Sequence, residues 1–134
     1  MNVLGRSTVI WIAILAVAIA NGAFRQGFLI PRLGDAAGHV ISTLLLSAAI
    51  ISVTLLTIGW IGPSSPGAAW GIGVYWLALT VAFEFLAGHY VFGTPWPVLL
   101  ADYNILRGRI WPLVLVATLV APALAARVRL SWDL

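Results

Sequence analysis

Apolar residues occur along this chain in four long runs that contain few polar residues and a single acidic one, Glu84. The runs cover about residues 7–24, 40–62, 68–92 and 110–126. A helix rises 1.5 Å per residue, so about 20 apolar residues cross the roughly 30 Å hydrocarbon core of a bilayer. The pattern therefore predicts an all-α protein with four membrane-spanning helices.

Polar residues within the second and third runs fall on one side of each predicted helix. At about 100° per residue, one band of the second helix and one face of the third collect most of the polar or small side chains. The band contains His39, Thr43, Ser47, Thr54 and Thr57, and the face contains Gly73, Trp76, Leu77, Thr80, Glu84, Ala87 and Gly88. Hydroxyl groups and small residues favour helix–helix contacts in lipid, so we expect both sets to point into a bundle.

Glycine and proline separate the runs. The stretch 26–38 contains Pro31 and Gly34, which predicts a connector, and residues 62–67 predict an uncharged turn between antiparallel neighbours. Thr94 and Pro95 favour a helix start and Gly108 favours its end. The predicted helix over about 95–107 follows span three and precedes span four, and it is too short to cross the membrane. We therefore expect it to lie at the membrane–water interface.

The first run allows a second interpretation. Arg6 followed by an apolar core and by Ala18-Ile19-Ala20 has the form of a secretory signal peptide. We favour a retained helix. Residues 1–134 are then one integral membrane domain.

Composition supports the membrane interpretation. The chain is 62% hydrophobic and 8% charged, with a mean hydropathy of +1.06, whereas soluble domains are about a quarter charged. The net charge is +3, but the seven arginines are dispersed between apolar runs and form no basic stripe, so we predict no nucleic-acid partner. The absence of cysteine excludes thiolate chemistry.

Threading four antiparallel spans brings most of the polar side chains to one membrane face. The candidate ligand-binding or ion-pair residues on that face are Asn21, Arg25, His39, Glu84, His89, Tyr90, Asp102, Tyr103, Asn104, Arg107 and Arg109. Both termini are predicted on the opposite face. The two faces carry similar numbers of arginines, so the positive-inside rule does not decide which face is cytoplasmic. We favour cytoplasmic termini, on the view that the arginines of the polar face serve a site.

Glu84 is the strongest single candidate for a functional residue. A carboxylate within a membrane helix costs roughly 2.5–3.5 kcal/mol and requires a partner, a proton or a cavity. Arg25, Arg107 or Arg109 can pair with it. The alternative is an ion pair that only locks the bundle.

Two histidines on adjacent predicted helices suggest cofactor binding as an alternative. His39 and His89 lie at a similar depth, an arrangement that can hold a b-type haem axially or contribute to a metal site. Their spacing from the acidic residues is not diagnostic. We therefore predict no cofactor and no metal.

The predicted interfacial helix carries a second polar group. Asp102, Tyr103 and Asn104, together with Arg107 and Arg109, can bind an anionic head group. Ordinary anchoring at the interface explains the same residues equally well.

These observations leave three functional hypotheses, because no nucleophile elbow, phosphate loop, HExxH or paired CxxC motif is present. The favoured hypothesis is binding of a small polar or anionic ligand, or a lipid head group, at the membrane surface. A small intramembrane enzyme would use Glu84, Asp102 and His89 as acid and base. An accessory subunit, or a homo-oligomer, would use the same polar residues for docking.

Several stretches of the sequence resemble stretches of known proteins. Residues 84–91, 99–104 and 108–111, with Asn21, Arg25 and the segment around His39, resemble a group of small bacterial integral membrane proteins of unknown function. The resemblance covers nearly the whole chain. It implies a four-helix protein of the bacterial inner membrane and implies no activity.

Overall fold

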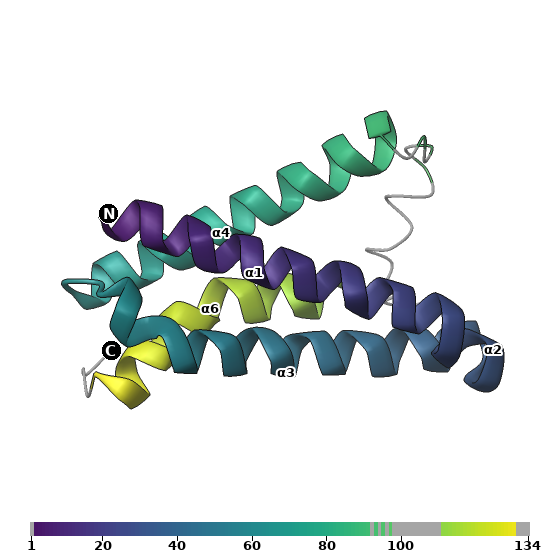
Figure 1. The fold of residues 1–134 in the computed structure, drawn as a ribbon, viewed down its shortest axis with the longest axis horizontal. Coiled ribbons are helices and arrows are strands. Elements are labelled where there is room, and N and C mark those ends of the chain that lie inside the picture. Colours follow the sequence, from purple (N-terminus) through teal and green to yellow (C-terminus); the bar gives the residue numbers. More distant parts are fainter. Residues whose placement is uncertain (1, 92, 94, 96, 98–110, 131–134) are drawn as a thin grey trace.

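The computed structural model describes residues 2–91, 93, 95, 97 and 111–130, and this part of the chain is helical with no strand (Figure 1). The elements are α1 (Val3–Phe24), η1 (Arg25–Leu29), α2 (Ile30–Leu33), α3 (Asp35–Ile61), α4 (Pro66–Leu86), η2 (Ala87–Val91) and α6 (Trp111–Arg129). The predicted all-α class is confirmed for the described residues. The predicted interfacial helix over 95–107 lies outside them, apart from Pro95 and Pro97.

The first helix is longer than predicted. The expected connector over 26–38 is helical up to Leu33, and α3 already begins at Asp35. Pro31 lacks an N–H and would clash with the carbonyl of Gly27 in a regular α-helix. In η1 the Ile30 N–H instead bonds to the Arg25 carbonyl, five residues back, so the wider π-turn accommodates the proline. The chain reverses at Gly34 (φ 91°, ψ 168°), a conformation that favours glycine.

The turn between α3 and α4 follows its sequence signals. Gly62 ends α3 in the left-handed conformation (φ 69°, ψ 49°). The Ser65 hydroxyl accepts a hydrogen bond of 3.1 Å from the Ala68 N–H, and Pro66 occupies the first turn of α4. This confirms the predicted turn.

The interior combines aliphatic side chains and one tryptophan with buried hydroxyl groups, and much of the surface is aliphatic. Ser42, Thr43, Ser47 and Thr54 of α3 are all buried, whereas large residues such as Leu56 are exposed. The exposed set includes Leu4, Ile12, Ile19, Leu44, Leu45, Val74, Leu86, Val116 and Val128. Helices in lipid gain from close packing inside and lose nothing by exposing hydrocarbon outside. The hydroxyl band of α3 therefore faces inward, as predicted.

Three helical segments are long and apolar enough to cross a membrane. They are Val3–Leu33, Asp35–Ile61 and Pro66–Leu86. Their length and composition are those of membrane-spanning helices. The fourth helix, α6, has 19 residues and packs against both α3 and α4 through buried alanines.

The helices begin and end at two ends of the bundle. Figure 1 shows the start of α1, the α3–α4 turn and the end of α6 at one end, and α2, the start of α3 and the end of α4 at the other. At the first end, Arg6 Nη1 donates to the Trp60 carbonyl at 3.0 Å.

This arrangement predicts a topology that single cysteines can test, because the chain contains none of its own. Cysteine at Ala36 and cysteine at Ser64, both exposed positions, should react with a membrane-impermeant thiol reagent from opposite sides of the membrane. Cysteine at Val128 should react from the same side as Ser64, since α6 returns the chain to that end. Labelling of Val128→Cys from the Ala36 side would mean that α6 does not span.

Candidate functional site

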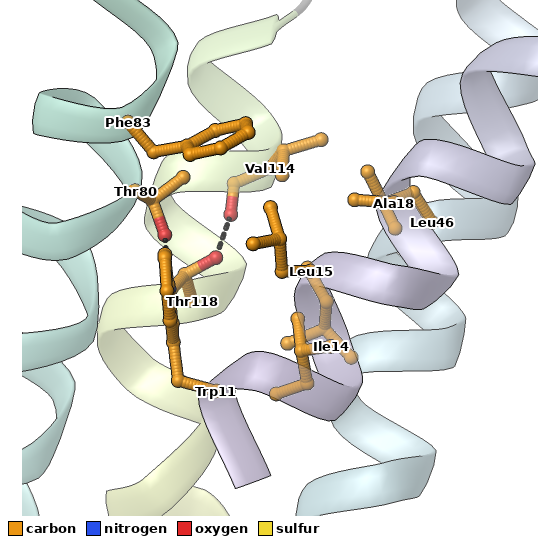
Figure 2. Close-up of a pocket in the computed structure, with 10 residues that line it drawn as sticks. Trp11, Ile14, Leu15, Ala18, Leu46, Thr80, Phe83, Val114 and Thr118 are labelled. Atoms are coloured by element: carbon orange, nitrogen blue, oxygen red, sulfur yellow. Dashed lines mark hydrogen bonds between the residues drawn. The ribbon is translucent and has the colours of Figure 1, made fainter. Parts of the chain in front are cut away.

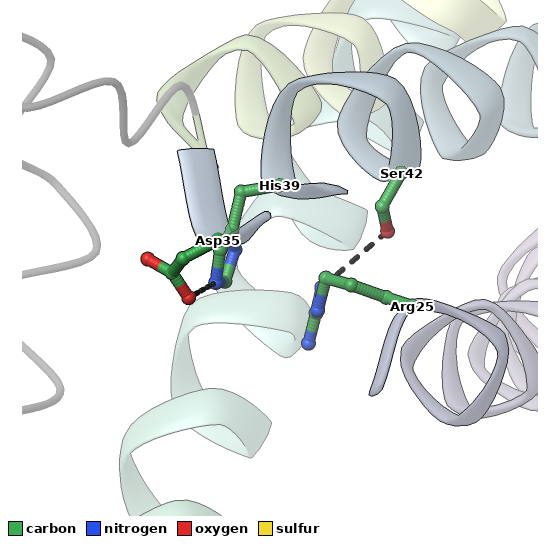
Figure 3. Close-up of polar contacts among 4 residues, drawn as sticks. All are labelled: Arg25, Asp35, His39 and Ser42. Atoms are coloured by element: carbon green, nitrogen blue, oxygen red, sulfur yellow. Dashed lines mark hydrogen bonds and ion pairs between the residues drawn. The ribbon is translucent and has the colours of Figure 1, made fainter. Parts of the chain in front are cut away.

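A polar cluster joins the first helix to the start of α3 (Figure 3). We define it as Asn21, Arg25, Asp35, His39 and Ser42. The Ser42 hydroxyl donates to Asn21 Oδ1 at 2.5 Å, and Asn21 Nδ2 donates to the Ser42 carbonyl at 3.1 Å. Arg25 Nη1 lies 3.5 Å from the Ser42 hydroxyl. The structure thus brings two of the predicted residues, Asn21 and Arg25, together at Ser42, and His39 lies one turn before Ser42 on α3.

Helical spacing explains the cluster. Asn21 and Arg25 are four residues apart on the first helix and therefore share a face. On α3, Ser42 follows His39 by three residues and lies on the same side. The close approach of the two segments depends on Gly38, where an added Cβ would lie 2.7 Å from a side-chain carbon of Ile30. The hairpin through Gly34 therefore holds the two polar faces against each other.

Arg25 lies deeper than the sequence suggested. It is eight positions before Leu33, the last residue of the first helical segment, which is about 12 Å of helix. Its side chain is half-buried. A Cβ added at Gly22 would lie 3.6 Å from Nη2 of Arg25, so the guanidinium folds back one turn along α1. Figure 3 shows the Arg25 side chain, from the start of η1, reaching toward Ser42 of α3.

His39 pairs with an acidic residue on its own helix. Its Nε2 lies 3.5 Å from Asp35 Oδ1 in an i, i+4 arrangement, with Asp35 mostly exposed. This contact is an ion pair when the imidazole is protonated. The same i, i+4 spacing is visible in the sequence, but the predicted connector placed Asp35 outside a helix and hid it.

The other predicted residues lie in the last turn of α4 or after it. Glu84 is half-buried in the last turns of α4, and His89 and Tyr90 lie in η2. The His89 and Tyr90 rings meet edge to face, with centroids 4.9 Å apart and planes at 87°. Asp102, Tyr103, Asn104, Arg107 and Arg109 lie outside the described residues, so the head-group hypothesis for that segment stays a prediction.

Metal-type ligands do not gather in the described part of the chain. There, no three His, Asp or Glu side chains lie close enough to hold a metal ion. The prediction that His39 and His89 hold no haem or metal is not tested by this observation.

Sequence reasoning missed Ser42. The predicted hydroxyl band contained its neighbour Thr43, but it is Ser42 that bonds to both Asn21 and Arg25. No signal in the sequence separates the two, because both lie on the buried side of α3. Only the pairing of α3 with α1 decides which hydroxyl meets the polar pair.

An apolar crevice lies deeper in the bundle (Figure 2). We define it by its lining residues: Trp11, Ile14, Leu15, Ala18, Leu46, Ile50, Thr80, Phe83, Val114 and Thr118. These residues come from α1, α3, α4 and α6. The crevice has a cavity volume of about 30 Å³ and is partly open. Sequence analysis did not predict it.

Similarity to known proteins gives no information on the function of this chain. No known protein family, curated protein or solved structure matches the chain. The membrane character expected from the resemblance holds, since three helices are long and apolar enough to span. The bacterial origin that the resemblance implies has no support from a matching relative.

Coupling between Glu84 and Arg25 remains a testable prediction. If the two side chains form a pair, Glu84→Gln and Arg25→Gln should each lower stability in detergent by several kcal/mol, since each strands a poorly solvated charge. The double variant should then lose less than the sum of the two single losses. Titration with sodium dodecyl sulfate, followed by circular dichroism, measures all three. Additive losses would show that the carboxylate and the guanidinium do not interact.

Proposed function

We propose that the protein binds an anionic group at the polar cluster, most readily the phosphate of a lipid head group. One observation carries the proposal: the Arg25 guanidinium is held between two membrane helices by Ser42, about two to three turns inside the end of the first. An arginine on a membrane helix is costly wherever it lies within the hydrocarbon core. Sites of this kind in membrane helices commonly serve ligands or ion pathways.

The chemistry of the cluster favours an oxyanion. A guanidinium presents its N–H donors in a planar fork that matches phosphate or carboxylate oxygens. The two hydrogen bonds between Asn21 and Ser42 fix the faces of α1 and α3 on which the cluster is built. This pre-organisation lowers the entropy cost of binding. Arg107 and Arg109 would add charge to the same membrane face if the chain returns there, as its sequence predicts.

The proposal also includes the location and the membrane topology of the protein. We place it in a bacterial inner membrane with four spans, α6 being the fourth, and with both termini in the cytoplasm. The polar cluster then faces the other side of that membrane. A head group in the outer leaflet of the inner membrane, or a small anion on that side, is the ligand this orientation makes available.

The test compares two arginines at opposite ends of the bundle. Purified protein in nanodiscs of phosphatidylcholine should take up phosphatidylglycerol, measured as bound lipid by native mass spectrometry. Arg25→Gln should weaken this uptake about tenfold, because losing one charge-assisted hydrogen bond costs about 1.4 kcal/mol or more. Arg6→Gln is the matched control, since Arg6 contacts Trp60 at the other end, and it should leave uptake unchanged.

The same preparation separates the alternatives. Equal uptake by all three proteins would overturn the lipid proposal. A soluble anion such as glycerol phosphate that competes with the lipid would show that the head group alone is recognised. A protein that co-purifies in fixed ratio from native membranes, with no Arg25-dependent lipid, would favour the accessory-subunit hypothesis.

A further inference from the structure

We infer that His39 is a second cationic group of the proposed anion site, and that it contacts the anion only when its imidazole is protonated. The inference rests on the proposed function and deepens it, because it names the residue that sets the charge of the polar cluster. The cluster then binds an anionic head group more tightly at acidic than at alkaline pH.

His39 lies beside the hydroxyl group that Arg25 contacts. It precedes Ser42 by three residues on α3, and side chains with this spacing are neighbours on a helix surface, with Cβ atoms about 5–6 Å apart. Arg25 Nη1 lies 3.5 Å from the Ser42 hydroxyl. Figure 3 shows the Arg25 and His39 side chains extending to the same side of α3. The guanidinium and the imidazole are thus placed to face one anion from two helical segments.

The imidazole is largely shielded from water, whereas its acidic neighbour is not. The His39 side chain is 17% exposed and the Asp35 side chain is 63% exposed. Gly38, directly before His39, is buried, and a Cβ added there would lie 2.7 Å from a side-chain carbon of Ile30. This close packing holds the start of α3 against the first helical segment. A charge on His39 therefore acts in a medium of low effective dielectric, where it attracts an anion more strongly than a surface charge does.

The chemical change occurs at Nδ1 of His39. Nε2 lies 3.5 Å from Asp35 Oδ1, and a neighbouring carboxylate favours a proton on the nitrogen that faces it. In the neutral ring Nδ1 is then an acceptor, which repels an oxyanion. In the imidazolium both ring nitrogens are donors. Nδ1 can then donate to a phosphate oxygen while Nε2 stays paired with Asp35.

The charge of the polar cluster follows the protonation of His39. The charges of Arg25 and Asp35 cancel, so the cluster is neutral when the imidazole is neutral. Protonation of His39 gives the cluster one net positive charge. Because histidine changes its charge between about pH 5 and pH 8, the switch falls in a range that membranes experience.

Neighbouring elements bring other ionisable groups to this end of the bundle. Arg32 of α2 is exposed, and its guanidinium lies 4.2 Å from the centroid of the Phe28 ring. α6 packs against α3, but Arg127 and Arg129 lie in its last turn, at the other end of the bundle. In the described part of the chain, α4 and η2 contribute Glu84, His89 and Tyr90. Glu84 and His89 are therefore the comparisons that an experiment on pH requires.

Uptake of phosphatidylglycerol at two pH values tests the inference. The intact protein in phosphatidylcholine nanodiscs receives increasing fractions of phosphatidylglycerol, and bound lipid is measured by native mass spectrometry at about pH 5.5 and about pH 8. The phosphodiester of this lipid keeps one negative charge throughout, so a difference reports the protein. We expect half-maximal uptake at about a tenfold lower lipid fraction at the acidic pH, since one charge-assisted hydrogen bond is gained.

Two substitutions of His39 fix its charge in opposite senses. His39→Gln is neutral at both pH values and should give the weaker uptake at both. His39→Arg is charged at both and should give the tighter uptake at both. Circular dichroism verifies each variant, and His39→Asn and His39→Lys replace any variant that does not fold.

Three further variants identify the group that carries the proton. Glu84→Gln and His89→Gln should each keep the dependence of uptake on pH, because neither changes His39. Asp35→Asn should keep it as well, since the imidazolium charge remains when its partner is neutral. Loss of the dependence in Asp35→Asn would show that the proton acts through the ion pair and not on the anion, which overturns the inference.

Failure of the inference differs from failure of the proposed function. Uptake that depends on Arg25 but is equal at both pH values would overturn the role of His39 and leave the head-group proposal standing. A dependence on pH that survives His39→Gln, or that disappears in His89→Gln or Glu84→Gln, would do the same. Absence of Arg25-dependent uptake at both pH values would overturn the proposed function together with the inference.

Discussion

Gly73→Ala should destabilise the protein by about 2–3 kcal/mol, because α4 and α6 touch through their backbones at this residue. A Cβ on Gly73 would lie 1.9 Å from the Leu119 carbonyl oxygen and 2.9 Å from its carbon. Neither atom can move without shifting α6 as a whole. Overpacking of this kind costs about 1–3 kcal/mol in proteins, and occasionally more. Titration of the detergent-solubilised protein with sodium dodecyl sulfate, followed by circular dichroism, measures the loss.

Gly71→Ala provides the matched control two residues away on the same helix. Nothing lies within 4 Å of a Cβ placed there, so stability should be unchanged or slightly raised by the better helix propensity of alanine. If both substitutions cost the same, the loss at Gly73 would come from the backbone of α4 and not from its contact with α6.

Trp76→Ala is the second substitution with a large expected effect, a loss of about 3–5 kcal/mol. Trp76 is the largest fully buried side chain in the described part of the chain, with 0% exposure, and its Nε1 donates to the Ser7 carbonyl at 2.9 Å. In lipid, helix association depends on packing contacts rather than on water exclusion. Removing the indole therefore leaves a cavity that the neighbouring helices fill only in part.

Two comparisons separate the packing term from the hydrogen bond. Trp76→Phe keeps a ring and loses the donor, so it should cost clearly less than Trp76→Ala, since interhelical hydrogen bonds in membranes average about 0.6 kcal/mol. Trp70→Ala changes a tryptophan of the same helix that is 43% exposed, and its effect should stay within about 0.5 kcal/mol. A loss at Trp70 equal to that at Trp76 would contradict a core role for Trp76.

The polar cluster and the crevice together give the protein an amphiphilic interior. The cluster lies near the bundle end that holds α2, and the crevice begins about two turns deeper on the same helix faces. The surface outside is aliphatic, with Leu56 76% exposed.

The first helical segment was predicted only in part from the sequence. Its apolar run and the shared face of Asn21 and Arg25 were predictable, because helical periodicity is local. Its continuation past Pro31 was not. The proline and glycines of residues 26–38 are typical of a connector, but the π-turn η1 absorbs the missing hydrogen bond. The correction places Arg25 inside a membrane helix instead of at its end.

The sequence by itself determined that this protein is helical, that its helices are long and apolar enough for a membrane, and which faces carry small or hydroxyl side chains. The physical reason is that backbone groups in lipid must bond within their own helix, so local periodicity suffices. The tertiary structure decided which faces meet. Ser42 rather than Thr43 contacts Asn21 and Arg25, Gly73 rather than Gly71 contacts α6, and Trp11 meets Thr80 at the crevice. These choices depend on the rotation and crossing of whole helices, which no single stretch of sequence encodes.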